Sequence, residues 1–229
     1  MIRRVLLRLI LTAVGLTLWF WTQSLIGARP LPSSGIGDGI LAWTSSINGY
    51  LHAHPAAAET LLIVSSGVID LLGIFLLGKW IFGPSVRPFL GLIFVLGLRQ
   101  LMQAVMALPT PENMIWHYPG FPSLLVTYGV ANDYFFSGHT SIAVLGATEL
   151  ARSGKRWVIA MAVLIALFEV STVLVLRAHY TMDVFTGAIA ALLVACVVGR
   201  AASPIDRLLS KVGQVADLRR VGNRPADAG

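Results

Sequence analysis

Residues 157–198 read WVIAMAVLIALFEVSTVLVLRAHYTMDVFTGAIAALLVACVV. Two apolar runs, Trp157–Leu176 and Tyr180–Val198, are separated only by a short polar junction. Each run matches the ~20 apolar residues that a helix needs to cross the hydrocarbon core of a bilayer. The pattern is therefore typical of two consecutive transmembrane helices.

Four more apolar runs precede this pair. They lie at Val5–Ile26, Thr60–Phe82, Phe89–Leu108 and Ser137–Ala151. Hydrophobic residues make up 56% of the 229-residue chain and charged residues only 12%, about half the share that is usual in soluble domains. The sequence thus predicts an all-α fold, a polytopic transmembrane helical bundle of about six spans.

The runs divide the chain into four regions. We interpret residues 1–27 as the first transmembrane span and a signal anchor, because the apolar stretch is long for a cleaved signal peptide. Residues 28–59 are expected to form an outer loop with a short interfacial helix near Ile40–Leu51. Residues 60–199 form the transmembrane bundle that carries the candidate catalytic residues, and residues 200–229 form a cytoplasmic tail that we expect to be poorly ordered.

Basic residues predict the orientation of the chain in the membrane. The net charge of +6 comes from Lys and Arg at the ends of apolar runs, which favours contact with anionic headgroups over nucleic acid binding. With six spans, four basic clusters fall on one side, the cytoplasmic side by the positive-inside rule. Arg29 and Arg177 are exceptions. The clusters are Arg3, Arg4 and Arg8; Lys79 and Arg87; Arg152, Lys155 and Arg156; and the arginines and lysine from Arg200 to Arg224.

Polar residues that suit catalysis gather at the opposite, outer side. His179 and Asp183 are four residues apart, so on a helix they would share one face. A carboxylate placed there can hold one imidazole nitrogen as N–H and leave the other as a nucleophile. His139 follows Ser137 and Gly138 at the start of another span, where a helix N-terminus can bind an anion and Ser137 can serve as its cap.

Together these segments supply an anion site, an oriented nucleophile and a second imidazole, which suits double displacement at phosphorus. The competing interpretation is that histidines at span ends are merely interfacial. The single cysteine, Cys196, lies in an apolar run, and the sequence presents no cluster that suits a metal. The three intramembrane carboxylates are each costly in lipid, so we expect Asp70 to pair with another span and Glu169 to line the outer cavity. The third is Glu149.

The paired blocks resemble the type-2 phosphatidic acid phosphatase superfamily. Its sphingomyelin synthase branch is similar in the block Asn132-Asp133-Tyr134-Phe135-Phe136-Ser137-Gly138-His139-Thr140 and in His179-Tyr180-Thr181-Met182-Asp183. An arginine-bearing segment that ends in Pro-x-Pro is matched by Arg99 through Pro111. Plant phosphatidylcholine:diacylglycerol cholinephosphotransferase is also similar, in Arg177-Ala178-His179-Tyr180-Thr181.

The sequence departs from the phosphatase branch at several positions. Phe136 stands where that branch has a proline, and Val173 stands where it has an arginine. Lys79 and Arg87 nearly form its lysine–arginine motif, but one residue too many separates them and they lie on the predicted cytoplasmic side. Asn132 replaces a glycine of the sphingomyelin synthase block.

The resemblance implies an enzyme in which His179 attacks phosphorus, Asp183 orients it and His139 transfers protons. A phospholipid donor and a lipid alcohol acceptor, ceramide or diacylglycerol, would be its substrates, with no cofactor and no metal. A lipid phosphate phosphatase and a non-catalytic headgroup-binding protein are the alternatives. The active site is expected on the outer face of a multi-pass membrane protein. Expected substrate-binding residues are Arg99, Ser137, Gly138, Arg177, Asp133 and Glu169.

Overall fold

The computed structural model describes residues 35–128 and 134–222, together with scattered helical positions between residues 10 and 25. The chain divides into two compact units, Met1–Gly37 and Asp38–Gly229. Most of the predicted first span lies outside the described residues. All residues that the structure describes are helical or irregular, which confirms the all-α fold.

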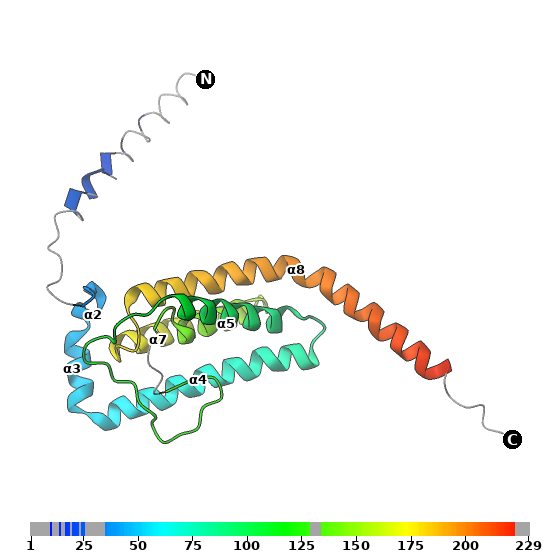
Figure 1. The fold of residues 1–229 in the computed structure, drawn as a ribbon, viewed down its shortest axis with the longest axis horizontal. Coiled ribbons are helices and arrows are strands. Elements are labelled where there is room, and N and C mark those ends of the chain that lie inside the picture. Colours follow the sequence, from blue (N-terminus) through cyan, green and yellow to red (C-terminus); the bar gives the residue numbers. More distant parts are fainter. Residues whose placement is uncertain are drawn as a thin grey trace. The chain divides into compact units, whose positions relative to one another are not determined.

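The second unit contains the helices that build the bundle (Figure 1). Within the described residues, α4, α5, α7 and the part Thr181–Lys211 of α8 are long and apolar enough to cross a membrane. The chain is therefore a multi-pass membrane protein, while the count of about six spans stays a prediction. The helices are α2 (Gly39–Trp43), α3 (Ser45–Ala53), α4 (Pro55–Phe82), α5 (Arg87–Val105), α6 (Gly138–Ala151), α7 (Arg156–Val175) and α8 (Thr181–Gly222).

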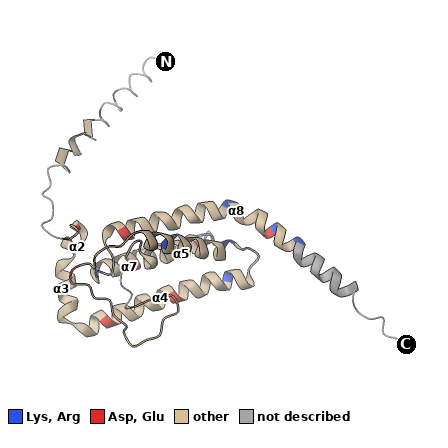
Figure 2. Ribbon diagram, in the orientation of Figure 1, with Lys and Arg blue, Asp and Glu red and all other residues tan. Residues whose placement is uncertain are grey.

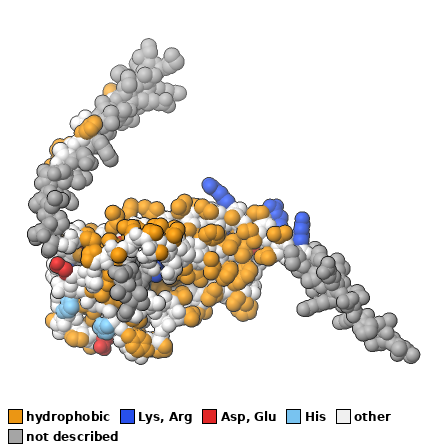
Figure 3. All heavy atoms as spheres, viewed as in Figure 1, with side chains coloured by type: hydrophobic (Ala, Val, Ile, Leu, Met, Phe, Trp, Pro, Cys, Tyr) orange, Lys and Arg blue, Asp and Glu red, His pale blue; other side chains and the backbone are white. Residues whose placement is uncertain are grey.

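Helix α6 lies at the centre of the bundle and contacts α4, α5, α7 and α8. Its 14 residues reach about 21 Å, which is short of the ~30 Å hydrocarbon core. A buried helix does not need a long lipid-facing surface, since its neighbours provide that surface. Figure 3 shows hydrophobic side chains covering much of the visible bundle surface, as lipid contact requires.

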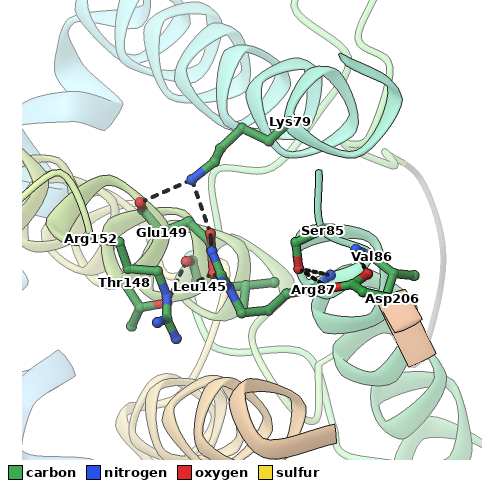
Figure 4. A network of polar contacts seen from close by, with 9 residues as sticks. All are labelled: Lys79, Ser85, Val86, Arg87, Leu145, Thr148, Glu149, Arg152 and Asp206. Carbon is green, nitrogen blue, oxygen red and sulfur yellow. Dashed lines mark hydrogen bonds and ion pairs between the residues drawn. The ribbon is translucent and has the colours of Figure 1, made fainter. Parts of the chain in front are cut away.

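Basic residues of α4 and α8 lie toward the end of the bundle away from α2 and α3 (Figure 2). Buried Glu149 of α6 joins three cations there, Lys79 Nζ at 3.2 Å, Arg87 Nε at 2.7 Å and Arg152 Nε at 3.1 Å (Figure 4). Lys79 and Arg87, interpreted from sequence as topology signals, therefore also neutralise a carboxylate inside the bundle. Their cytoplasmic location stays a prediction.

The same end is closed by a contact from α8. Asp206 Oδ1 accepts a hydrogen bond from Val86 N at 2.7 Å, and Asp206 Oδ2 accepts one from Ser85 Oγ at 2.8 Å (Figure 4). The carboxylate thereby caps the N-terminus of α5. Helix α8 continues to Gly222, so the described part of the predicted cytoplasmic tail is helical, while its location and its poor order stay predictions.

Candidate active site

A small cavity lies where the start of α6, the turn before α8 and the C-terminal part of α5 meet. Its volume is about 90 Å³, several times the ~10–15 Å³ that one water needs. The predicted residues Arg99, Gly138, His139 and His179 all line it. The other lining residues are Ile69, Leu96, Met114, Trp116, Leu125, Val126, Thr127, Tyr134, Ile142 and Ala178.

His179 lies in the turn that precedes α8, so the prediction that it shares a helix with Asp183 is wrong. Its Nδ1 is 2.8 Å from the backbone carbonyl oxygen of Tyr134. A carbonyl oxygen can only accept a hydrogen bond, so Nδ1 must carry the proton. In the neutral ring, Nε2 then keeps its lone pair.

Asp183 acts on this ring through charge and not through a hydrogen bond. Its Oδ2 lies 3.8 Å from His179 Nδ1 and accepts a hydrogen bond from the backbone N–H of Tyr180 at 2.9 Å. The carboxylate is fully buried, and its Oδ1 has no partner among the described residues. A buried negative charge this close to the ring can stabilise positive charge that develops on the imidazole during a reaction.

The first turn of α8 is packed directly against the start of α6. Ser137 N donates to the backbone oxygen of Asp183 at 3.1 Å. A Cβ on Gly187 would lie only 2.7 Å from the backbone oxygen of Ser137, so the lack of a side chain permits this approach. Ser137 Oγ accepts a hydrogen bond from Thr140 N at 3.3 Å, which confirms the predicted cap. These contacts fix the two histidine-bearing segments relative to one another.

His139 and Arg99 occupy the α6 side of the cavity. The His139 ring is buried and lies edge-on to the Trp116 ring, with 5.1 Å between the ring centroids. Within the described part of the chain, its Nε2 has no hydrogen-bond partner. Arg99 Nε donates to the Phe136 carbonyl oxygen at 3.1 Å. A Cβ on Gly138 would lie 3.0 Å from that Nε, so the glycine lets the guanidinium reach the helix start.

Four predicted residues do not line the cavity: Arg177, Glu169, Ser137 and Asp183. Arg177, with φ of 55°, donates to the carbonyl oxygens of Glu112 at 2.9 Å and Leu41 at 3.1 Å. Glu169 is fully buried and accepts a hydrogen bond from Ser65 Oγ at 2.6 Å. Asp133 lies outside the described residues.

Several contacts that hold the site were missed by sequence reasoning. Asp38 caps α2 and accepts hydrogen bonds from Thr181 N at 2.6 Å and Thr181 Oγ1 at 2.7 Å. Burial by itself would raise the pKa of Asp38, but the hydrogen bonds from Thr181 and from the first amides of α2 outweigh it and hold the pKa below its usual range. Tyr180 Oη donates to the Pro109 carbonyl oxygen at 3.0 Å. No local pattern signals these partners, which are distant along the chain.

Comparisons with known proteins identify the family of the chain. The sequence profile of the AtPDCT1/2 family matches residues 38–200, which is more than half of the chain. Phosphatidylcholine:diacylglycerol cholinephosphotransferase 1 of Arabidopsis thaliana is 20% identical over 188 residues, which cover 82% of this chain and 61% of that relative. The chain thus spans less than two thirds of the relative's length.

A solved structure shares the fold. The crystal structure of Aquifex aeolicus LpxE matches with a TM-score of 0.53 at 19% identity, over 70% of this chain and 94% of LpxE. The predicted similarity to the plant cholinephosphotransferase is confirmed, while the sphingomyelin synthase branch stays a prediction. Because the family profile matches more than half of the chain, including both histidine-bearing segments, the chain belongs to the AtPDCT1/2 family.

Proposed function

We propose that this protein is a lipid phosphotransferase that moves a phospholipid headgroup, with its phosphoryl unit, to a lipid alcohol. The observation that carries the proposal is His179, a cavity-lining imidazole whose Nδ1–H is donated to the Tyr134 carbonyl oxygen. Its Nε2 is then available to attack phosphorus. His139 and Arg99 line the same cavity and supply a proton carrier and a positive charge.

In the first step, the lone pair of His179 Nε2 forms a bond to phosphorus, and the bond from phosphorus to the lipid alkoxide oxygen breaks. His139 gives its proton to that leaving oxygen, so a neutral lipid alcohol departs. The phosphorylated ring is a cation that still donates Nδ1–H to Tyr134. Asp183, 3.8 Å from Nδ1, stabilises this cation.

In the second step, the hydroxyl oxygen of the acceptor attacks phosphorus and gives its proton to His139. The bond between phosphorus and Nε2 breaks, which regenerates the neutral imidazole of His179. Arg99 counters the negative charge that develops on the phosphoryl oxygens in both steps. Proton transfer is assigned to His139 and not to Glu169, because Glu169 does not line the cavity.

The substrate class follows from the family. The name of the Arabidopsis relative specifies phosphatidylcholine as donor and diacylglycerol as acceptor. We propose the same classes here, a choline-type phospholipid and a two-chain lipid alcohol. Apolar side chains around the cavity, among them Leu96 and Ile142, suit the hydrocarbon part of a lipid next to its phosphate.

The test is a transfer assay with the purified full chain in lipid nanodiscs. Headgroup-labelled phosphatidylcholine is incubated with and without an added diacylglycerol of distinct chain length, and the products are separated by mass. We expect labelled phospholipid with the new chains, lost in His179→Ala and kept in His117→Ala, an exposed histidine of the outer connection. Phosphate release from phosphatidic acid at a rate indifferent to acceptor would instead identify a phosphatase. No turnover of either lipid would refute an enzyme.

A further inference from the structure

Residues 123–128 of the connection between α5 and α6 return to the middle of α4 (Figure 1). The Asp70 carboxylate of α4 accepts hydrogen bonds from Leu124 N at 2.8 Å and from Leu125 N at 2.9 Å. Ser123 Oγ lies 3.0 and 2.9 Å from the two oxygens of the same carboxylate. Asp70 was expected to pair with another span, and that prediction is wrong, because its partner is this irregular segment.

The contact lies deep along the helix. Asp70 follows Pro55 by 15 residues and precedes Phe82 by 12, which at 1.5 Å per residue places it about 22 Å from the start and about 18 Å from the end of α4. The end of α4 carries Lys79, a residue of the basic cluster that belongs at headgroup level. Asp70 precedes Lys79 by nine residues, which is about 14 Å along the helix and close to the middle of the ~30 Å hydrocarbon core.

Irregular backbone at this depth must have its polar groups satisfied. A non-helical segment is tolerated at this depth only where its backbone N–H and C=O groups find partners in the protein or in a water-filled cavity, whereas an apolar side chain such as Leu124 can face lipid. Asp70 takes the N–H groups of Leu124 and Leu125, and Ser123 Oγ accepts the N–H of Val126 at 3.2 Å. A carboxylate inside a span costs free energy, and here its structural role is to accept hydrogen bonds from the backbone of this segment.

The segment also forms part of the cavity wall. Leu125, Val126 and Thr127 line the cavity together with His139 and His179. Leu125 lies tightly on α4, since a Cβ added to Gly73 would be 2.3 Å from its Cδ1. Moving this segment would therefore change the shape of the space beside both histidines.

We propose that residues 123–128 form a re-entrant segment that Asp70 holds in place. This segment forms one wall of the cavity and selects the lipid substrate by the shape of its hydrocarbon part next to the phosphate. Asp70 is a positioning residue in this scheme and does not touch the reacting atoms. The selecting role rests on the proposed function, whereas the re-entrant placement does not.

The placement is tested by thiol labelling of the full chain in proteoliposomes, after Cys196→Ser removes the native cysteine. Leu124→Cys and Tyr118→Cys are a matched pair, because their side chains are 62% and 58% exposed on the same connection. We expect an impermeant maleimide to react with Tyr118→Cys about tenfold or more faster, since a thiol in hydrocarbon rarely ionises. Detergent denaturation should equalise the rates. Equal rates in intact vesicles would overturn the re-entrant placement.

The selecting role is tested by kinetics with a pair of glycines in α4. Gly73→Ala pushes on Leu125, whereas a Cβ at Gly78 meets no atom within 4 Å. We expect Gly73→Ala to raise the KM for the lipid substrate several-fold with a smaller change in kcat, and Gly78→Ala to leave both constants unchanged.

The outcomes separate the two claims. If Gly73→Ala behaves like Gly78→Ala, the segment does not select the lipid. If the wild-type protein turns over no lipid, the proposed function fails, while the labelling result still decides the re-entrant placement. Asp70→Asn adds a third measurement, since loss of the carboxylate should accelerate labelling of Leu124→Cys.

Discussion

Replacing Asp183 by asparagine tests how the structure activates His179. The Asp183 Oδ2 atom lies 3.8 Å from His179 Nδ1, and the carboxylate is fully buried. At an effective dielectric of about 20, unit charges at this separation interact by about 4 kcal/mol. Since 1.36 kcal/mol corresponds to a tenfold rate change, loss of the charge should slow formation of the phosphohistidine by up to about a thousandfold.

The substitution is conservative in shape. The side-chain oxygen of asparagine can still accept the hydrogen bond from Tyr180 N, so we expect the variant to fold. The Tyr134 carbonyl oxygen still accepts from His179 Nδ1, so the tautomer should stay as in the wild type. Sequence reasoning expected Asp183 to set the tautomer, and the structure assigns that hydrogen bond to Tyr134.

The assay is rapid quenching of purified protein mixed with labelled phospholipid, followed by alkaline isolation of the phosphohistidine, because this adduct is acid-labile. Asp183→Asn should lower the rate of adduct formation with little change in the donor KM. Nitrogen NMR of His179 should still show the proton on Nδ1. Asp206→Asn, which removes a carboxylate at the far end of the bundle, is the control and should leave the rate unchanged. A wild-type rate in Asp183→Asn, or a proton moved to Nε2, would refute the reasoning.

Three further predictions follow from the site and the topology. His179→Ala should abolish the adduct and all transfer, and the wild-type reaction should retain configuration at phosphorus, as chiral-phosphate analysis would show; inversion would exclude the two-step route. Gly138→Ala should lower kcat/KM by displacing the nearby arginine, whereas Gly97→Ala, which meets no atom within 4 Å, should not. In intact cells, a cysteine-free chain carrying Glu112→Cys should be labelled by an impermeant reagent and one carrying Lys155→Cys should not; the reverse pattern would place the active site in the cytoplasm.

Local sequence patterns were sufficient for the elements of the fold. Apolar runs near Thr60–Phe82 and Trp157–Leu176 predicted helices that the structure has at Pro55–Phe82 and Arg156–Val175. Ser137 was identified as a cap because capping depends on residues within one turn. Hydropathy and capping are short-range properties, so sequence alone determined them.

The motifs also located the histidines of the candidate site. His139 and His179 line one cavity, as expected from two polar segments at the same side of the bundle. The roles of charged residues were less accessible from sequence. Arg177 and Glu169 are the right chemical types for a phosphoryl site, yet the structure directs them to backbone carbonyls and to Ser65.

What only the tertiary structure decided is which groups meet across the bundle. Tyr134 and His179 are 45 residues apart, and Asp70 and Leu125 are 55 apart. In both pairs at least one partner is a backbone group, which every residue possesses, so residue identity carries no signal for it. Sequence determined the helices and the reactive side chains through local chemistry, whereas the tautomer of His179 and the re-entrant wall depend on backbone groups that only packing brings into reach.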